Sequence, residues 1–132
     1  MEINNHKSNK VDTQLEINFR IQDEISHEFI DFNFKHTRHS YQRASQRGIS
    51  SNKIEAALQF GESIYKQGLI YFILGENNIP QTLIKERNTL INTVVVVSGD
   101  SNQLITCYRS SNPFRNIKHK SKKLFHNYGH AA

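Results

Sequence analysis

Thr93-Val-Val-Val-Val-Ser98 is the segment of this chain that most strongly predicts a β-strand. Four consecutive β-branched residues suit a strand in the middle of a sheet. Gly99-Asp-Ser-Asn102 follows with turn-forming residues, and Gln103–Tyr108 then returns as a second strand. We therefore expect Thr93–Ser98 to be central and to pair antiparallel with Gln103–Tyr108.

Four further strands are expected upstream, from apolar alternation or from short apolar runs next to turns: Leu15–Ile21, Ile30–Phe34, Ser63–Lys66 and Leu69–Leu74. The first two can form a hairpin that leads into a helix. Gln67-Gly68, between the last two, is a two-residue turn signal. Residues 76–91 fit either a short surface helix that begins near Pro80 or a plain loop.

Two helices are expected between the two pairs of strands. The first spans His39–Arg47, with Gly48 as its C-terminal stop and Ile49 tucked back beneath it. Ser50 or Ser51 can cap the second helix, which ends at Gly61. Its apolar stripe, at the i, i+3, i+4 spacing of a helix packed on a sheet, consists of Ile54, Ala57 and Leu58.

This order of elements predicts an α+β domain with the helices on one face of an antiparallel sheet. At 132 residues the chain is long enough for one domain with a modest core. We expect a flexible N-terminus at residues 1–13, the α+β domain at 14–112 and a basic tail at 113–132.

The composition argues against membrane and secreted classes of protein. Hydrophobic residues make up 36% of the chain, and no apolar run is long enough to span a membrane. The polar start of the chain lacks the apolar core of a secretory signal. The lone Cys107 excludes an internal disulfide and fits a reducing cytoplasm, where we expect it to be a buried small hydrophobe.

The positive charge of the chain is concentrated near its C-terminus. After Pro113 there are five basic residues and no acidic residue, which accounts for the whole formal net charge of +5. These residues are Arg115, Lys118, Lys120, Lys122 and Lys123. Such a segment attracts polyanions, of which nucleic acid is the most abundant in the cytoplasm. The alternative interpretation is a disordered tail that only increases solubility.

A second basic feature lies on the first predicted helix. His39, Arg43 and Arg47 are spaced i, i+4, i+8, so they line one helix face, with Arg38 near its start. Such a stripe is often only a solvated face. At the end of the last strand, Tyr108 and Arg109 add further polar groups. Strict alternation predicts Leu104, Thr106 and Tyr108 on one face of that strand, and Ile105, Cys107 and Arg109 on the other.

These residues predict an RNA site rather than a metal or cofactor site. No histidine has zinc-finger or H-E-x-x-H spacing, and no Gly-rich phosphate loop is present. A histidine, several arginines and a tyrosine could cleave RNA through its own 2′-hydroxyl, without a metal. Histidine suits this role because its ordinary pKa is about 6.5. The predicted catalytic set is His39, Arg43, Arg47, Tyr108 and Arg109, and Arg38 joins the tail in nucleic-acid binding.

The segments His39-x3-Arg43-x3-Arg47-Gly-Ile and Leu104-Ile-Thr-Cys-Tyr-Arg109 resemble a family of small bacterial and phage proteins. That family carries only a domain-of-unknown-function label and is distantly related to the RelE/ParE and BrnT toxins. The resemblance covers about Phe34 to Lys123, with Ser40 where alanine is common and Ser110 where asparagine often follows. It implies a RelE-like fold, with two N-terminal helices against a twisted antiparallel sheet. RelE-type toxins cut mRNA, so it also implies an RNA substrate and an antitoxin or another protein partner.

Two other interpretations stay open on the sequence. In one, the basic stripe and tail grip RNA or a protein partner without catalysis. In the other, the motif is structural, and His39 and the arginines cap strands or hold C-terminal carbonyl groups and acids such as Glu55 and Glu62. Catalysis requires a titratable group within hydrogen-bond reach of the arginines, whereas binding requires only positive charge.

Overall fold

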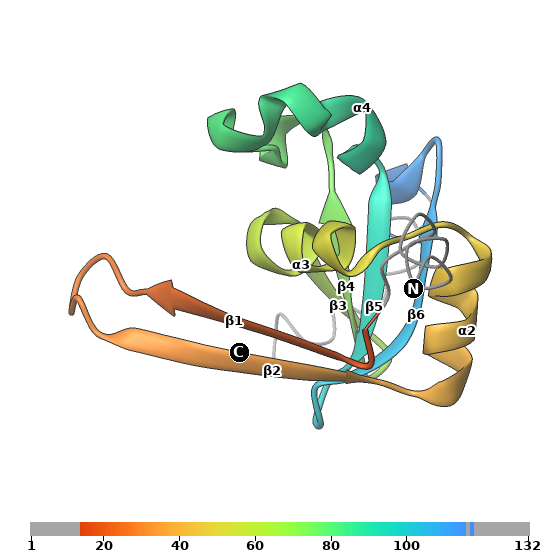
Figure 1. Cartoon of the computed structure of the whole chain (residues 1–132), viewed down its shortest axis with the longest axis horizontal. Coiled ribbons are helices and arrows are strands. Elements are labelled where there is room, and N and C mark those ends of the chain that lie inside the picture. The colour runs from red at the N-terminus through yellow and green to blue at the C-terminus, as the bar shows by residue number, and fades with distance from the viewer. Residues whose placement is uncertain (1–13, 116, 118–132) are drawn as a thin grey trace, which may run out of the picture.

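The computed structural model describes residues 14–115 and residue 117 of the chain, and these form a six-stranded sheet with helices packed against it (Figure 1). The order across the sheet is β1-β2-β6-β5-β4-β3. The strands are β1 (Glu16–Gln22), β2 (Phe29–His36), β3 (Glu62–Lys66), β4 (Leu69–Leu74), β5 (Thr93–Ser98) and β6 (Gln103–Arg109). In this part of the chain no helix is long and apolar enough to cross a membrane.

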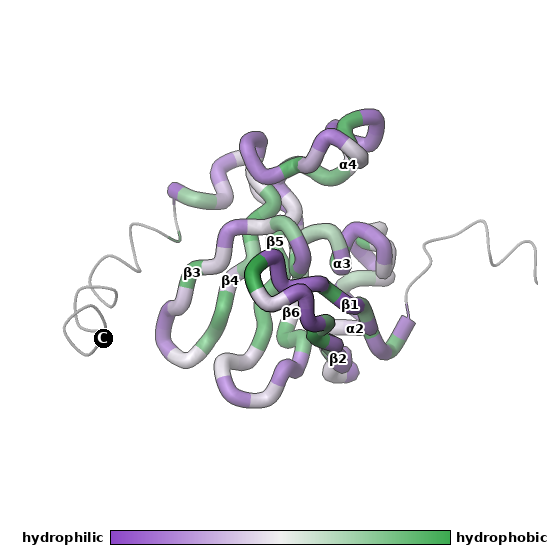
Figure 2. Tube along the Cα trace, turned by 90° about the vertical axis from the view of Figure 1, so that its left-hand side faces the viewer, coloured by the Kyte–Doolittle hydropathy of each residue, from purple (hydrophilic) through white to green (hydrophobic). Residues whose placement is uncertain are grey.

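β5 is the central strand of the main body, as the sequence predicts. It pairs antiparallel with both β4 and β6, and each of its four valines is at most 2% exposed. Figure 2 shows hydrophobic residues concentrated along β4 and β5. A strand without an exposed face needs cover on both sides, and two separate layers supply it.

On one face of the sheet, α3 (Ser51–Phe60) supplies the cover. Ile54 and Ala57 are fully buried in the same cluster as Val95 and Val97, so the predicted apolar stripe of this helix is confirmed. Ser50 caps the helix with its side chain, which accepts a hydrogen bond from the main chain of the first turn.

On the other face, Val94 and Val96 pack with Ile73 and with two residues from beyond β6. These are Phe114, which is partly buried, and Ile117, which is 5% exposed. The beginning of the predicted basic tail therefore contributes to the core, and residues 113–115 are helical.

α2 (Arg38–Gln46) lies beside β6, and local capping fixes both of its ends (Figure 1). Thr37 is the N-cap, and its Oγ1 accepts from the Ser40 N–H at 3.0 Å. Gly48, at φ +68°, donates to Ser45 O, and Ile49 N–H donates to Ala44 O at 2.9 Å. This is a Schellman motif, which requires the positive φ that glycine adopts without cost.

The segment between β4 and β5 consists of short helical turns. It contains η1 (Glu76–Asn78), η2 (Gln81–Glu86), for which Pro80 is the N-cap, and α4 (Arg87–Leu90). Of the two predicted alternatives for residues 76–91, the helical one is therefore correct. The β3–β4 turn is also as predicted, because Gln67 and Gly68 both have positive φ.

The structure corrects the predicted fold in two respects. The α+β class holds, but the sheet is mixed, because β2 runs parallel to β6 over two residue pairs, Lys35–Gln103 and His36–Leu104. The helices follow the β1–β2 hairpin, as the predicted order of elements has it, so the N-terminal position of the helices that the resemblance implies does not hold. A parallel pair joins strands that are far apart in sequence, so it leaves no local pattern for a sequence argument to detect.

The predicted alternation along β6 is wrong because of a β-bulge. Val96 pairs with Thr106 but Val97 pairs with Leu104, so Ile105 is an extra residue. As a result, Leu104 shares the α3 face with Cys107, while Ile105 joins Tyr108 on the opposite face. One inserted residue reverses the alternation along the rest of β6. Tyr108 therefore lies on the face opposite α3, away from the predicted site residues of α2.

We predict that Val96→Asp abolishes folding. Val96 is 2% exposed among apolar side chains, so the carboxylate would be buried without a partner, at a cost of several kcal/mol. The matched control is Gln103→Asp, at an exposed position of the neighbouring strand β6. Circular dichroism melting should show a cooperative transition for the control only. A cooperative melt of Val96→Asp would contradict the central placement of β5.

Candidate nucleic-acid interface

Three of the predicted site residues lie on α2. His39 and Arg43 are one turn apart on the same side, and Arg38 begins the helix, about 100° round its axis from His39. Arg38 and His39 are exposed and Arg43 is half-buried. Arg43 Nε donates a hydrogen bond to His39 Nε2 at 3.2 Å. In this geometry the Nε2 atom of His39 is the acceptor, so its ring proton is on Nδ1.

The stretch of chain that contains α2 carries basic residues and no acidic residue. Residues 32–54 contain five lysines or arginines, two histidines and no acid. Among the described residues, no acidic side chain forms an ion pair with Arg38, His39 or Arg43. We call Arg38, His39 and Arg43 the α2 basic face. Its charge is available to an external anion.

Arg47 is placed differently from the rest of the stripe. It is the C-cap residue of α2, and its guanidinium donates to the main-chain oxygen of Cys107 at 2.8 Å. Beyond Leu104, β6 is no longer paired with β2, so this edge of the strand has free carbonyl groups. Arg47 therefore ties α2 to the edge of β6, which is the structural role that one open interpretation assigned to it.

Arg109 also binds main-chain oxygens. Its guanidinium donates to Ile91 O at 2.8 Å and to Asn88 O at 3.1 Å. Both oxygens lie at the C-terminal end of α4, where carbonyl groups lack helical partners and a cation is favoured. The prediction that an arginine of the motif holds C-terminal carbonyls is confirmed for Arg109, whereas neither Glu55 nor Glu62 is its partner.

Tyr108 does not reach the α2 basic face. The bulge at Ile105 places it on the face of the sheet opposite α3, where it packs against the cluster of Ile73 and Val96. Burial, and secondarily the neighbouring Tyr71, raises the pKa of its phenol. The predicted set of five is thus divided into the α2 basic face, two arginines on main-chain carbonyls, and a tyrosine on the far face. Their catalytic roles stay predictions.

His36 is a residue of this region that sequence reasoning did not include in the site. Its Nδ1 lies 2.6 Å from Oγ of Ser40, a side chain that is fully buried, and its ring meets Tyr41 edge-on. Its Nε2 is buried and has no hydrogen-bond partner among the described residues. Burial therefore lowers the pKa of His36, because a charged ring would bury an N–H without an acceptor. No local signal marks His36, because it is the last residue of β2 and its burial comes from packing.

Cys107 contributes its carbonyl oxygen and not its thiol. The side chain is 1% exposed, and burial raises the pKa of the thiol to about 11, although the charge of Arg47 acts in the opposite direction. A thiol in this state is neither a nucleophile nor a metal ligand at neutral pH. The prediction of a buried small hydrophobe is confirmed.

The predicted binding residues of the tail are only partly described. Arg115 lines a polar cavity of about 710 Å³, whose wall also includes Glu62, Asn78, Asn92 and Asn112. Lys118, Lys120, Lys122 and Lys123 lie outside the described residues. Within the described part of the chain, no group of three His, Cys, Asp or Glu side chains is arranged to hold a metal ion.

Comparison with known proteins places the chain in one family. A family model described as "Domain of unknown function (DUF4258)" matches residues 36–109, which is more than half of the chain. The protein therefore belongs to this uncharacterised domain family. The matched region begins at His36 and ends at Arg109, so it contains the α2 basic face and both structural arginines. No curated protein and no solved structure matches the chain.

We predict that the stability of the protein falls as the pH decreases from 7.5 to 5.5, in part through His36. The pKa of this ring is lowered in the folded state, so the unfolded chain binds the proton more readily below about pH 6.5. The stabilisation that His36 contributes is present in full above its pKa in the unfolded chain. It is lost as the pH falls towards its pKa in the folded protein.

Melting temperatures across this pH range provide the measurement. His36→Gln should flatten the pH dependence, whatever its effect on absolute stability, whereas His39→Gln at an exposed position should leave the slope as in the parent. An identical slope for the parent and His36→Gln would contradict the assignment.

Proposed function

We propose that the protein binds single-stranded RNA through the α2 basic face, with the basic C-terminal tail as a second contact. The observation that carries this proposal is the group of exposed Arg38 and His39 with half-buried Arg43 in an acid-free stretch, without an acidic partner among the described residues. Unpaired exposed cations release condensed counterions when they bind a phosphate backbone, which gives affinity without sequence preference.

The position of the face supports this proposal. α2 is fixed at its start by Thr37, at its end by the Schellman motif, and along β6 by Arg47. The three donors therefore project from a rigid helix and lose little conformational freedom as a unit when a ligand binds. Guanidinium groups also match the geometry of phosphate oxygens better than ammonium groups do.

The choice of RNA over other polyanions rests on the motif similarity. The segments around His39 and Tyr108 resemble those of proteins related to RelE/ParE and BrnT toxins, some of which act on mRNA. We include in the proposal a RelE-like arrangement of helices and sheet and a protein partner of antitoxin type. These finer statements are supported by the sequence motifs alone.

The first prediction of this proposal is a salt-sensitive affinity that depends on α2. If about five phosphates are contacted, log K for a labelled single-stranded RNA should fall against log salt with a slope of about −3 to −4. Arg38→Ala combined with Arg43→Ala should reduce the magnitude of that slope by about 1.4 and weaken binding about tenfold at low salt.

The matched control for this prediction is Lys85→Ala combined with Arg87→Ala. It removes the same total charge from the region between β4 and β5, where Arg87 is paired with Glu76. Fluorescence anisotropy on the three full-length proteins compares the effects. Equal losses in the two double variants would mean that overall charge, and not α2, determines binding. A salt-independent affinity would contradict the proposal.

Metal-independent RNA cleavage is the second candidate function, and the contact between His39 and Arg43 favours it. The exposed imidazole could remove the proton of a 2′-hydroxyl once the Arg43 guanidinium, 3.2 Å away, turns from His39 Nε2 to the phosphate, where it could stabilise the charge that develops. Tyr108 and Arg109 do not lie beside this pair, so any further catalytic group would come from elsewhere. Binding alone therefore requires fewer assumptions about the site.

For this second candidate we predict cleavage in EDTA that yields 2′,3′-cyclic phosphate ends. His39→Gln should reduce the rate by a factor of about 10² to 10⁴, because it removes one acid–base group, with little change in melting temperature. His27→Asn is the control, since His27 is an exposed histidine in the β1–β2 loop at φ +65°, which asparagine tolerates. Intact RNA after prolonged incubation would leave binding as the activity.

A further inference from the structure

The β1–β2 hairpin projects away from the body of the protein (Figure 1). Its base is packed, since Ile17 is 3% and Phe34 is 6% exposed, but its outer part is not. Phe29 is 60% and Ile25 is 90% exposed. β1 lies wholly outside the residues that match the family model. The hairpin is therefore a projecting element with exposed apolar side chains, separate from the α2 basic face.

The outer edge of β1 carries main-chain groups that no other described strand pairs with. His36 N–H donates to Leu15 O at 2.9 Å, and Asp23 N–H donates to Glu28 O at 2.8 Å. Odd-numbered residues of β1 therefore face β2. The main-chain groups of the even-numbered residues point to the free edge: Glu16, Asn18, Arg20 and Gln22. A seven-residue open edge is a template for pairing with another strand.

The opposite edge of the hairpin is less available. On β2, Lys35 N–H donates to Asn102 O at 3.2 Å, and the Asn102 side chain reaches Asn33 O at 3.5 Å. The turn before β6 therefore blocks the inner half of this edge. Within residues 14–115, only Phe29 and Asp31 keep outward main-chain groups free of such contacts, so β1 is the edge that can accept a whole strand.

We propose that β1 pairs antiparallel with β1 of a second copy of this chain, about a two-fold axis at Phe19. This register pairs all seven residues of β1. It also places the residues whose main-chain groups point to the free edge opposite the same kind of residue in the second copy. Asn18 lies opposite Arg20 of the second copy, and Glu16 opposite Gln22. An axis at Arg20 would instead place two guanidiniums opposite each other, which is unfavourable.

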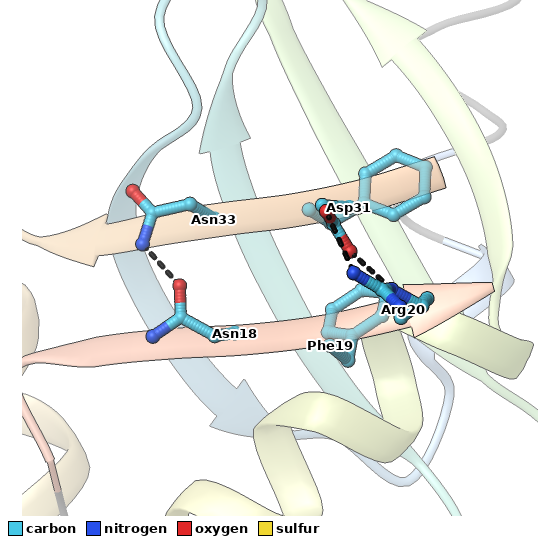
Figure 3. Close-up of a pocket in the computed structure, with 6 residues that line it drawn as sticks. Asn18, Phe19, Arg20, Asp31 and Asn33 are labelled. Carbon is cyan, nitrogen blue, oxygen red and sulfur yellow. Dashed lines mark hydrogen bonds and ion pairs between the residues drawn. The ribbon is translucent and has the colours of Figure 1, made fainter. Parts of the chain in front are cut away.

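The side chains on both faces are complementary in this register. Figure 3 shows Asn18 and Arg20 on one face of the hairpin, where they contact Asn33 and Asp31 of β2. On this polar face, Glu16 lies diagonal to Arg20 of the second copy, which adds an opposite-charge pair.

The apolar face of the hairpin also continues into the second copy across the two-fold axis. Phe19 stacks on Phe32 at 5.3 Å between ring centroids, and in the dimer it would meet Phe19 of the second copy. Ile17 would meet Ile21. The axis is perpendicular to the sheet, so α3 of the second copy lies on this same face. It would approach the outer part of the hairpin, where Ile30 is 48% exposed.

Cross-linking tests the register directly. The chain has a single cysteine, Cys107, which is buried, so an introduced thiol is the only accessible one among the described residues. Phe19→Cys should form an intermolecular disulfide on mild oxidation, because Cα atoms of a non-hydrogen-bonded antiparallel pair are about 4.5 Å apart.

Phe32→Cys is the matched control for this experiment. It removes a ring from the same aromatic stack, but its two copies would be three strand spacings apart, roughly 14 Å, which is too far for a disulfide. Sedimentation velocity of the full-length parent should show a monomer–dimer transition at about micromolar concentration, because a single-strand interface is small. Asn18→Pro should shift the protein to monomer, since it removes an outward N–H that β2 does not use.

The outcomes separate clearly. A disulfide dimer for Phe19→Cys but not for Phe32→Cys supports the proposal, even if Asn18→Pro fails to fold. Equal cross-linking of the two variants, a dimer that Phe19→Cys does not trap, or a parent that stays monomeric up to about 100 times that concentration would overturn it.

Discussion

The structure depends on the complete burial of β5. A strand of four valines with no exposed face requires a layer on each side, and it also requires a neighbour along each edge. α3 provides one layer through Ile54 and Ala57, and the segment with Phe114 and Ile117 provides part of the other. The positions of β4, β6 and α3 follow from this requirement. α2 and the β1–β2 hairpin lie outside it, and our two proposals concern their surfaces.

Features set by neighbouring residues could be read from the sequence. The Schellman motif at Gly48 and the turn at Gln67 depend on a few adjacent residues, and both were predicted. The stripe of α3 and the valines of β5 follow from periodicity and β-branching. The parallel pairing of β2 with β6 could not be predicted, because its energy comes from strands far apart in the chain. The bulge at Ile105 has no glycine or other local signal, yet it reverses the alternation of β6.

The candidate site was predictable in its residues but not in its geometry. Helical spacing correctly placed His39 and Arg43 together. Tyr108 was assigned to the same site because it belongs to the second group of polar side chains, at the end of β6, and the bulge placed it among apolar side chains instead. For Arg47 and Arg109 the sequence left a catalytic and a structural role open, since nothing in a sequence marks a carbonyl group that lacks a partner. His36 was overlooked because its significance lies in burial, which only the packed structure reveals.

The contacts of Arg47 and Arg109 also have an evolutionary consequence. Each guanidinium binds main-chain oxygens, at Cys107 for the first and at Ile91 for the second, and every residue type carries such an oxygen. The side chains at these acceptor positions can therefore change without loss of the contact, whereas each arginine must keep its length and charge. A contact of this kind produces no paired substitutions among relatives. Among relatives it would appear only as two invariant arginines without covarying partners.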